Sequence, residues 1–377
     1  MNRFSRMIGL TCLLALVGMA GLGGCGDPPM SIPPLPTGIP AGAAALLPTQ
    51  GIYTGAYIDF GEAEDQVTLE NIEHFEELVG KHQAIIASSS YWGENSFPSA
   101  NLALIARHNS IPLVFWSPWN RPYEEKRGPD DARLENILAG RLDAYIDRWA
   151  DAAKAYDRSL LVSWGLEMNG DWYPWSGYYN NHPAKAADKE GNRHPGPELY
   201  KRAYRYVVDR VRGRGAHRIQ WVFHANNLCF PNDPWNRIGQ YYPGADYVDW
   251  LGLSVYGKQF QESPWSSFDP LMDDPYRQLC LLDPSKPIIV AEWGVGEFPA
   301  AGSKATWIGD AFAAFKTKYA RVKAIVFWHE RWQNGDESYS NLRVNSSPES
   351  LAAYRTAVAD PFFLGYPQIT ADKRPRP

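Results

Sequence analysis

The chain has 377 residues, of which 45% are hydrophobic, 14% aromatic and 21% charged. These are globular proportions, and the length fits one large domain with loop insertions better than two enzymatic domains. The formal net charge of −5 argues against nucleic acid or an anionic membrane surface as the main partner.

The N-terminus has the layout of a secretory signal. Arg3 and Arg6 precede a largely apolar run over residues 7–22, which is too short to span a membrane comfortably. The run ends in Leu22-Gly23-Gly24-Cys25, which resembles a bacterial lipobox, where the cysteine is lipidated and becomes the first mature residue. We therefore expect a signal peptide over 1–24 and a chain anchored in the bacterial cell envelope through Cys25. The alternative is a plain signal peptide cleaved nearby, with Cys25 incidental.

Seven prolines follow within residues 26–50, a stretch with little that could pack. This composition predicts an extended tether over 25–50, outside the fold. The folded domain is then expected over 51–365, followed by a C-terminal tail over 366–377.

Two cysteines, Cys229 and Cys280, lie inside the expected domain. Spacing alone leaves open whether they form a disulfide or remain free thiols. No Cys/His cluster shows metal-ligand spacing along the sequence, and no glycine-rich phosphate loop is present. We therefore expect neither a metal nor a cofactor, and we expect a monomer.

From Gly51 onward, short apolar or β-branched runs alternate with longer amphipathic stretches. The candidate strands occupy residues 52–57, 84–88, 113–116, 161–165, 219–223, 248–254, 288–291 and 324–328. Most are continuous apolar runs, as expected for parallel strands covered on both faces. Between them, residues 141–156, 199–211 and 307–319 place apolar side chains at helical spacing. This alternation, without a Rossmann glycine signature, predicts a single (β/α)8 TIM barrel, with a doubly wound open sheet as the alternative.

In a TIM barrel the active site lies at the C-terminal ends of the strands. The residues that end or follow the expected strands include carboxylates, amides and aromatic rings: Trp116, Trp119, Glu167, Asp171, Trp172, Trp175, Asn226, Tyr256, Glu292 and Trp328. Such a rim is typical of a polysaccharide cleft, because flat amphipathic rings can stack on sugar faces.

Glu167 and Glu292 follow the fourth and seventh expected strands, 125 residues apart. Cleavage of a glycosidic bond needs a proton for the leaving oxygen and stabilisation of an oxocarbenium-like centre, and two carboxyl groups supply both. A single glutamate at a strand end could instead bind an arginine or cap a helix. The pair, each amid Trp and Gly, favours catalysis.

Three segments resemble glycoside hydrolase family 26. Residues 167–175 (EMNGDWYPW) look like its acid/base motif, 242–253 like its entry to the sixth strand, and 288–294 (IIVAEWG) like its nucleophile strand. The resemblance covers about residues 51–360. It implies a retaining barrel enzyme with Glu167 as acid/base and Glu292 as nucleophile. It also implies that Tyr256 holds Glu292 by a hydrogen bond and that Trp328 forms a floor under the −1 sugar.

The other rim residues have two interpretations each. The tryptophans at 116, 119, 172 and 175 stack on sugar rings or pack long loops, while Asn226 and Asp171 bond sugar hydroxyls or organise the loops. Among the competing carboxylates, Glu94, Glu297 and Glu330 are interpreted as rim or structural residues, with Glu330 the best placed to touch substrate.

The sequence departs from the family beside its acid/base. Mannanases of the family carry His there and the wider clan carries Asn, whereas this chain has Leu166. The segment Trp116-Ser117-Pro118 likewise stands where mannanases tend to present a His. Both departures weaken the case for mannan, so β-mannan stays the first expected substrate only because mannanases are frequent in the family, with β-1,3-1,4-glucan close behind. β-1,3-Xylan and a bacterial exopolysaccharide are further alternatives. The broad, Trp-rich rim favours internal cleavage of a polymer, so we expect an endo-acting enzyme.

A different class of function is a catalytically weak, glycan-binding lipoprotein that retains the barrel. Leu166 would then mark a loss of activity. The presence of Glu167, Glu292 and Tyr256 together argues against this interpretation, because a binding protein has no need of a nucleophile.

Overall fold

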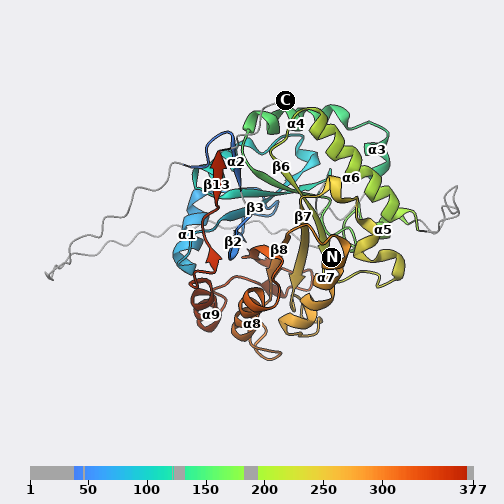
Figure 1. Ribbon diagram of the computed structural model, residues 1–377. Coiled ribbons are helices and arrows are strands. Elements are labelled where there is room, and N and C mark those ends of the chain that lie inside the picture. The colour runs from blue at the N-terminus through green and yellow to red at the C-terminus, as the bar shows by residue number, and fades with distance from the viewer. Residues whose placement is uncertain (1–37, 46, 121, 123–131, 182–193, 372–377) are drawn as a thin grey trace, which may run out of the picture.

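The computed structural model describes residues 38–45, 47–120, 122, 132–181 and 194–371 (Figure 1). The expected signal peptide, Cys25 and most of the expected tether lie outside these ranges. Among the described residues, no helix combines the length and the apolar character needed to cross a membrane.

Eight parallel strands form a closed barrel. They are β2 (Ile52–Tyr57), β3 (Ile85–Tyr91), β4 (Ile111–Ser117), β5 (Leu160–Trp164), β6 (Ile219–Asn226), β7 (Trp250–Tyr256), β8 (Ile288–Gly294) and β9 (Val322–Trp328). Each strand pairs with the next, and β2 also pairs with β9 in a register that runs from Tyr53–Ala324 to Tyr57–Trp328. This last pairing closes the sheet. The predicted TIM barrel is therefore confirmed, and the open doubly wound sheet is wrong.

Helices surround the barrel (Figure 1). The longer ones are α1 (Leu69–Val79), α2 (Ser99–Arg107), α4 (Asp143–Tyr156), α6 (Gly196–Gly213), α7 (Phe268–Leu282), α8 (Lys304–Thr317) and α9 (Pro348–Val358). Helix α4 buries Tyr145, Ile146 and Trp149 against the strands, which is the stripe that the helical spacing predicts. Local signals set the helix ends: the Thr68 side chain caps the start of α1, and Gly80 ends it with a φ of 71°.

Shorter elements fill the loops. They are helices α3 (Leu134–Leu138) and α5 (Gly177–Asn180), four 3₁₀ turns (Trp92–Glu94, Pro234–Asn236, Ile238–Tyr241 and Ala245–Tyr247), the antiparallel hairpin of β10 (Arg331–Gln333) and β11 (Tyr339–Asn341), and β12 (Phe363–Leu364), which pairs with the start of β2. The hairpin follows β9 directly and so lies at the same end of the barrel as the two glutamates.

The folded domain begins and ends outside the predicted limits of 51 and 365. Strand β1 (Ala43–Ala45) pairs antiparallel with β13 (Ile369–Ala371). The Ile39 amide donates to the Ala106 carbonyl at 2.8 Å, and the Ala45 amide donates to Ser159 Oγ at 2.6 Å. The predicted boundary is wrong because alanines have weak strand propensity, and their pairing depends on a partner more than 300 residues away.

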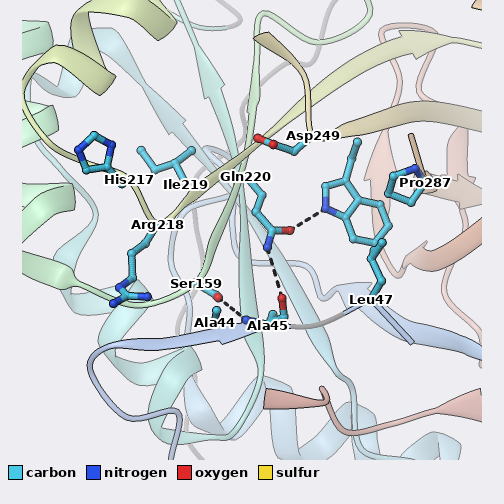
Figure 2. A pocket seen from close by; sticks show the side chains of 11 residues that line it. Ala44, Ala45, Leu47, Ser159, His217, Arg218, Ile219, Gln220, Asp249 and Pro287 are labelled. Carbon is cyan, nitrogen blue, oxygen red and sulfur yellow. Dashed lines mark hydrogen bonds between the residues drawn. The ribbon is translucent and has the colours of Figure 1, made fainter. Parts of the chain in front are cut away.

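A pocket of about 270 Å³ lies where β1 meets the starts of β6 and β7 (Figure 2). The Trp250 indole donates to Gln220 Oε1 at 2.7 Å, and the Gln220 amide reaches the Ala45 carbonyl at 3.5 Å. These bonds tie the N-terminal segment to the bottom of the barrel, opposite the strand ends that carry the two glutamates.

Cys229 and Cys280 are both free thiols. Both cysteines are half-buried, and the Cys229 sulfur lies 3.5 Å from Asn169 Nδ2. Of the two possibilities that the sequence leaves open, the structure therefore has the free thiols.

Candidate active site

The barrel brings Glu167 and Glu292 to one rim. Glu292 lies near the end of β8, and Glu167 follows β5 in a sharp turn with a φ of 52°. The Glu167 amide donates to the His224 carbonyl at 2.7 Å, which fixes this turn against β6. Non-glycine residues with positive φ are uncommon and concentrate at functional sites. Both carboxylates are 94% buried, with only 6% of each residue exposed.

The register of β6, β7 and β8 aligns three polar residues across the sheet. Asn226 of β6 pairs with Ser254 of β7, and Ser254 pairs with Glu292 of β8. The Asn226 amide then reaches sideways to Glu167 Oε1 at 2.9 Å. One layer of the barrel therefore connects the two carboxylates.

Glu167 is held between two donors. The Trp172 indole donates to Oε2 at 2.7 Å, while Asn226 donates to Oε1. Burial raises the pKa of the Glu167 carboxyl above its ordinary value, although hydrogen bonds from Ser254, Asn226 and Trp172 oppose this, and the charge of Glu64 adds to the rise. A carboxyl with a raised pKa can carry a proton near neutral pH and deliver it, as a general acid must.

Glu292 has a different environment. The Tyr256 hydroxyl donates to Glu292 Oε2 at 2.7 Å. Burial and the Glu292 charge raise the pKa of Tyr256 well above its ordinary value, so the phenol stays protonated and keeps donating. A donor of this kind favours the ionised carboxylate, which is the form that a nucleophile needs.

A neutral histidine supports the layer. His224 Nδ1 lies 3.1 Å from Ser163 Oγ, and Nε2 lies 2.8 Å from Ser254 Oγ. Burial lowers the pKa of His224 to about 3, so the ring is uncharged at neutral pH. The imidazole joins β5, β6 and β7 beneath the carboxylates without adding a charge to them.

Part of the chain matches a known protein family. The family model described as glycosyl hydrolase family 26 matches residues 132–301. The chain belongs to glycosyl hydrolase family 26.

Two relatives and one structure illustrate its place in family 26. Endoglucanase H of Acetivibrio thermocellus is 32% identical over 312 residues, which are 82% of this chain and 30% of that protein. Mannan endo-1,4-beta-mannosidase of Bacillus subtilis strain 168 is 28% identical over 253 residues, covering 64% of this chain and 58% of that one. The chain thus spans less than two thirds of either relative. The catalytic domain of a Bacillus sp. JAMB-750 family 26 endo-beta-1,4-mannanase has the same fold, with a TM-score of 0.58 at 18% identity and coverage of 83% and 87%.

Three of the four predicted stacking tryptophans are packing residues. Trp116 is fully buried outside the barrel, where it stacks on Trp149 with ring centroids 3.9 Å apart and donates to the Tyr145 hydroxyl at 2.9 Å. Its assignment to the cleft is wrong because side chains alternate along β4. Phe115 points inward, with its ring 6.2 Å from that of Trp328, so Trp116 points outward.

Trp119 and Trp175 are also buried, at 3% and 1% exposed. The Trp175 indole donates to the Leu166 carbonyl at 2.7 Å and its ring stacks on Tyr173 with centroids 4.5 Å apart. Their packing role, the second of the two sequence interpretations, is therefore the one that the structure favours. Trp172 remains half-buried beside Glu167.

The structure places the remaining predicted residues as follows. Trp328 is buried, stacks on Tyr57 with ring centroids 4.0 Å apart, and donates to Glu330 Oε2 at 2.7 Å. Glu330 therefore orients the Trp328 indole through this hydrogen bond. Asn226 organises Glu167, as described above, and Asp171 is exposed.

The other two competing carboxylates have structural partners. Glu94 accepts from the Tyr91 amide at 3.2 Å. Glu297 Oε2 accepts from the Ser346 hydroxyl at 2.7 Å and from two further serines near the start of α9. Both agree with the rim or structural interpretation.

Sequence reasoning missed Glu64. This residue follows β2 in an acidic loop, is 5% exposed, and accepts from Ser89 Oγ at 2.8 Å. Its charge raises the pKa of Glu167. The loop sequence gives no apolar or motif signal, and only its place after the first barrel strand could have marked Glu64 as a rim residue.

A pair of conservative substitutions separates packing from catalysis. Trp116→Phe keeps an aromatic ring but loses the indole N–H that donates to Tyr145, so we expect the free energy of unfolding to fall by about 1–3 kcal/mol with KM unchanged. Trp172→Phe loses the donor to Glu167, so we expect kcat/KM to fall roughly tenfold or more with little loss of stability. Denaturant unfolding and steady-state kinetics measure both. A change of KM in the first variant with unchanged stability would return Trp116 to the cleft.

Glu64→Gln should change the pH profile. Removal of this charge lowers the pKa of Glu167, and a group that is expected to act as a general acid can deliver a proton only while it is protonated. The alkaline limb of kcat/KM is therefore expected to move to lower pH. Glu62→Gln, the same change on an exposed neighbour, is the control and should leave the limb in place. A limb that moves equally in both variants, or in neither, would remove Glu64 from this role.

Proposed function

We propose that this protein is a retaining, endo-acting glycoside hydrolase that cleaves a β-linked polysaccharide by double displacement. The single observation that carries the proposal is the contrast between the two carboxylates. Glu167 is buried between an indole and an amide with a raised pKa, while Glu292 accepts a hydrogen bond from Tyr256. One group is suited to hold a proton and the other to stay charged.

In the first step, a Glu292 oxygen attacks the anomeric carbon as the glycosidic bond breaks. Glu167 gives its proton to the leaving oxygen, and a covalent glycosyl-enzyme remains. In the second step, Glu167 takes a proton from water, and the resulting hydroxide oxygen bonds to the anomeric carbon. The bond to Glu292 breaks, the carboxylate is regenerated, and the two inversions restore the original configuration.

Two polysaccharides are candidates for the substrate. β-Mannan comes first, on the predominance of mannanases in the family. β-1,3-1,4-Glucan is the second candidate, and Leu166 is the residue that favours it. Leu166 stands beside Glu167 where mannanases carry His, and its side chain offers no hydrogen bond to the 2-hydroxyl whose orientation distinguishes mannose from glucose. The relative named endoglucanase H, matched over 82% of this chain, supports the same alternative.

Reducing-sugar release from β-mannan, β-1,3-1,4-glucan and β-1,3-xylan tests the activity and identifies the backbone. We expect internal cleavage of one of the first two polymers, abolished in Glu292→Ala. Azide should rescue that variant on an activated aryl β-oligosaccharide and yield an α-glycosyl azide, because azide enters from the side that the carboxylate leaves open.

Glu94→Gln is the control for that variant, since Glu94 is an exposed carboxylate bonded to its own turn, and it should keep activity. Full activity in Glu292→Ala would remove Glu292 as nucleophile. If no polymer is cut while glycan binding survives Glu292→Ala, the weak binding lipoprotein becomes the better interpretation.

We further propose that the protein is a lipoprotein of the bacterial cell envelope, anchored through Cys25. The support is the sequence alone: basic residues, an apolar run and Leu22-Gly23-Gly24-Cys25. A single acyl chain binds membranes weakly, so stable anchoring needs the multiple chains of a bacterial lipoprotein.

Cys25→Ser should move the chain from the membrane fraction to the soluble fraction of its host. Cys12→Ser, a cysteine inside the apolar run, is the matched control and should leave the chain in the membrane fraction. Cell fractionation with immunoblotting measures the partition. Equal membrane retention of both variants would refute lipidation at Cys25.

A further inference from the structure

Three potential metal ligands meet on the side of the barrel near α1 and α2 (Figure 1). Glu76 lies on α1, His82 lies in the turn that leads into β3, and His108 directly follows α2 as its C-cap. One donor atom from each lies within 4.8 Å of the others. Because His82 precedes β3, the cluster lies toward the bottom of the barrel, away from the rim of Glu167 and Glu292.

The donor atoms face one another at short range. Glu76 Oε2 lies 3.0 Å from His82 Nδ1 and 3.0 Å from His108 Nε2. Tetrahedral zinc with bonds of about 2.0–2.1 Å places neighbouring ligand atoms roughly 3.3 Å apart. Small rotations of the two imidazoles would therefore admit an ion between them and the carboxylate.

The surroundings orient the ligands and protect them from water. The Gln83 amide donates to Glu76 Oε1 at 2.8 Å, which fixes the carboxylate; Oε2 contacts both imidazoles, and Oε1 also lies 3.0 Å from His82 Nδ1. The His82 ring stacks on Tyr366 with centroids 4.0 Å apart at 16°. The three side chains are only 11–15% exposed. Bonds that hold ligands from behind are a regular feature of metal sites.

The chemistry of the donors selects the ion. Two imidazole nitrogens and one carboxylate oxygen suit zinc and its neighbours among the divalent transition metals, whereas calcium and magnesium prefer oxygen ligands alone. A dication would also neutralise the buried Glu76 carboxylate, whose ionised form the two imidazoles already favour by hydrogen bonding and charge.

We propose that Glu76, His82 and His108 form a zinc-binding site with water as the fourth ligand. The ion joins α1, α2 and the start of β3, which come from two successive βα units. Its position away from the catalytic rim makes it a stabilising site: ligands that meet only in the folded chain convert metal affinity into folding free energy.

Metal binding to the full chain tests the proposal directly. After treatment with EDTA, calorimetric titration with Zn²⁺ should show one ion bound per chain, and the ion should raise Tm. Co²⁺ in place of Zn²⁺ should give the visible absorption bands of a tetrahedral nitrogen and oxygen site. Ca²⁺ and Mg²⁺ should change neither signal. Absence of Zn²⁺ binding by the wild-type chain would overturn the proposal and leave a hydrogen-bonded triad.

Variants assign the ligands. His82→Gln and His108→Gln should each weaken Zn²⁺ binding by about 100-fold or more. Loss of a ligand should cost at least as much affinity as loss of a residue that only hydrogen-bonds to a ligand, which costs about 10–100-fold. His217→Gln, an exposed histidine elsewhere at the bottom of the barrel, should bind as wild type. Glu76→Gln keeps the size of the side chain and serves if a histidine variant fails to fold. Unchanged affinity in the folded ligand variants would place the ion elsewhere and refute this site.

Discussion

The pairing of β2 with β9 is the constraint on which the candidate site depends. The strands are parallel and therefore end on one rim, and this pairing closes them into a ring, so residues 125 positions apart can act together. The row that runs from Asn226 through Ser254 to Glu292 depends on this ring, because the strands must stay in register for the amide of Asn226 to reach Glu167. Parallel strands with both faces covered also exclude water from beneath the carboxylates.

Around Glu167, burial and hydrogen bonding act in opposite directions. Burial favours the neutral acid, while the Trp172 and Asn226 donors favour the anion. In the proposed double displacement the same group is an acid in one half of the reaction and a base in the other, so neither influence could dominate without stopping one step. The neutral His224 holds the layer together without entering this balance.

The sequence predicts the structural features that repeat along the chain and the residues that belong to a recognisable motif. The barrel follows from continuous apolar strands, and the two glutamates follow from their place after the fourth and seventh strands. The prediction that Trp116 lines the cleft is wrong because neighbouring side chains on a strand point to opposite faces. The end of β4 also lies one residue beyond the predicted end. The zinc ligands lie 6 and 26 residues apart on separate elements, so only the fold brings them together. Glu64 acts at a distance through its charge, which no local pattern encodes.

The antiparallel pairing of β1 with β13 determines where another protein or a support can be fused to this domain. Both ends of the folded chain leave beside the starts of the strands, and the Ile39 amide is bonded there to the last turn of α2. Whatever is attached before residue 38 or after residue 371 is therefore attached on the side away from the carboxylates. A support, a fluorescent protein or a second domain could be fused at either end without covering the rim that carries Glu167 and Glu292.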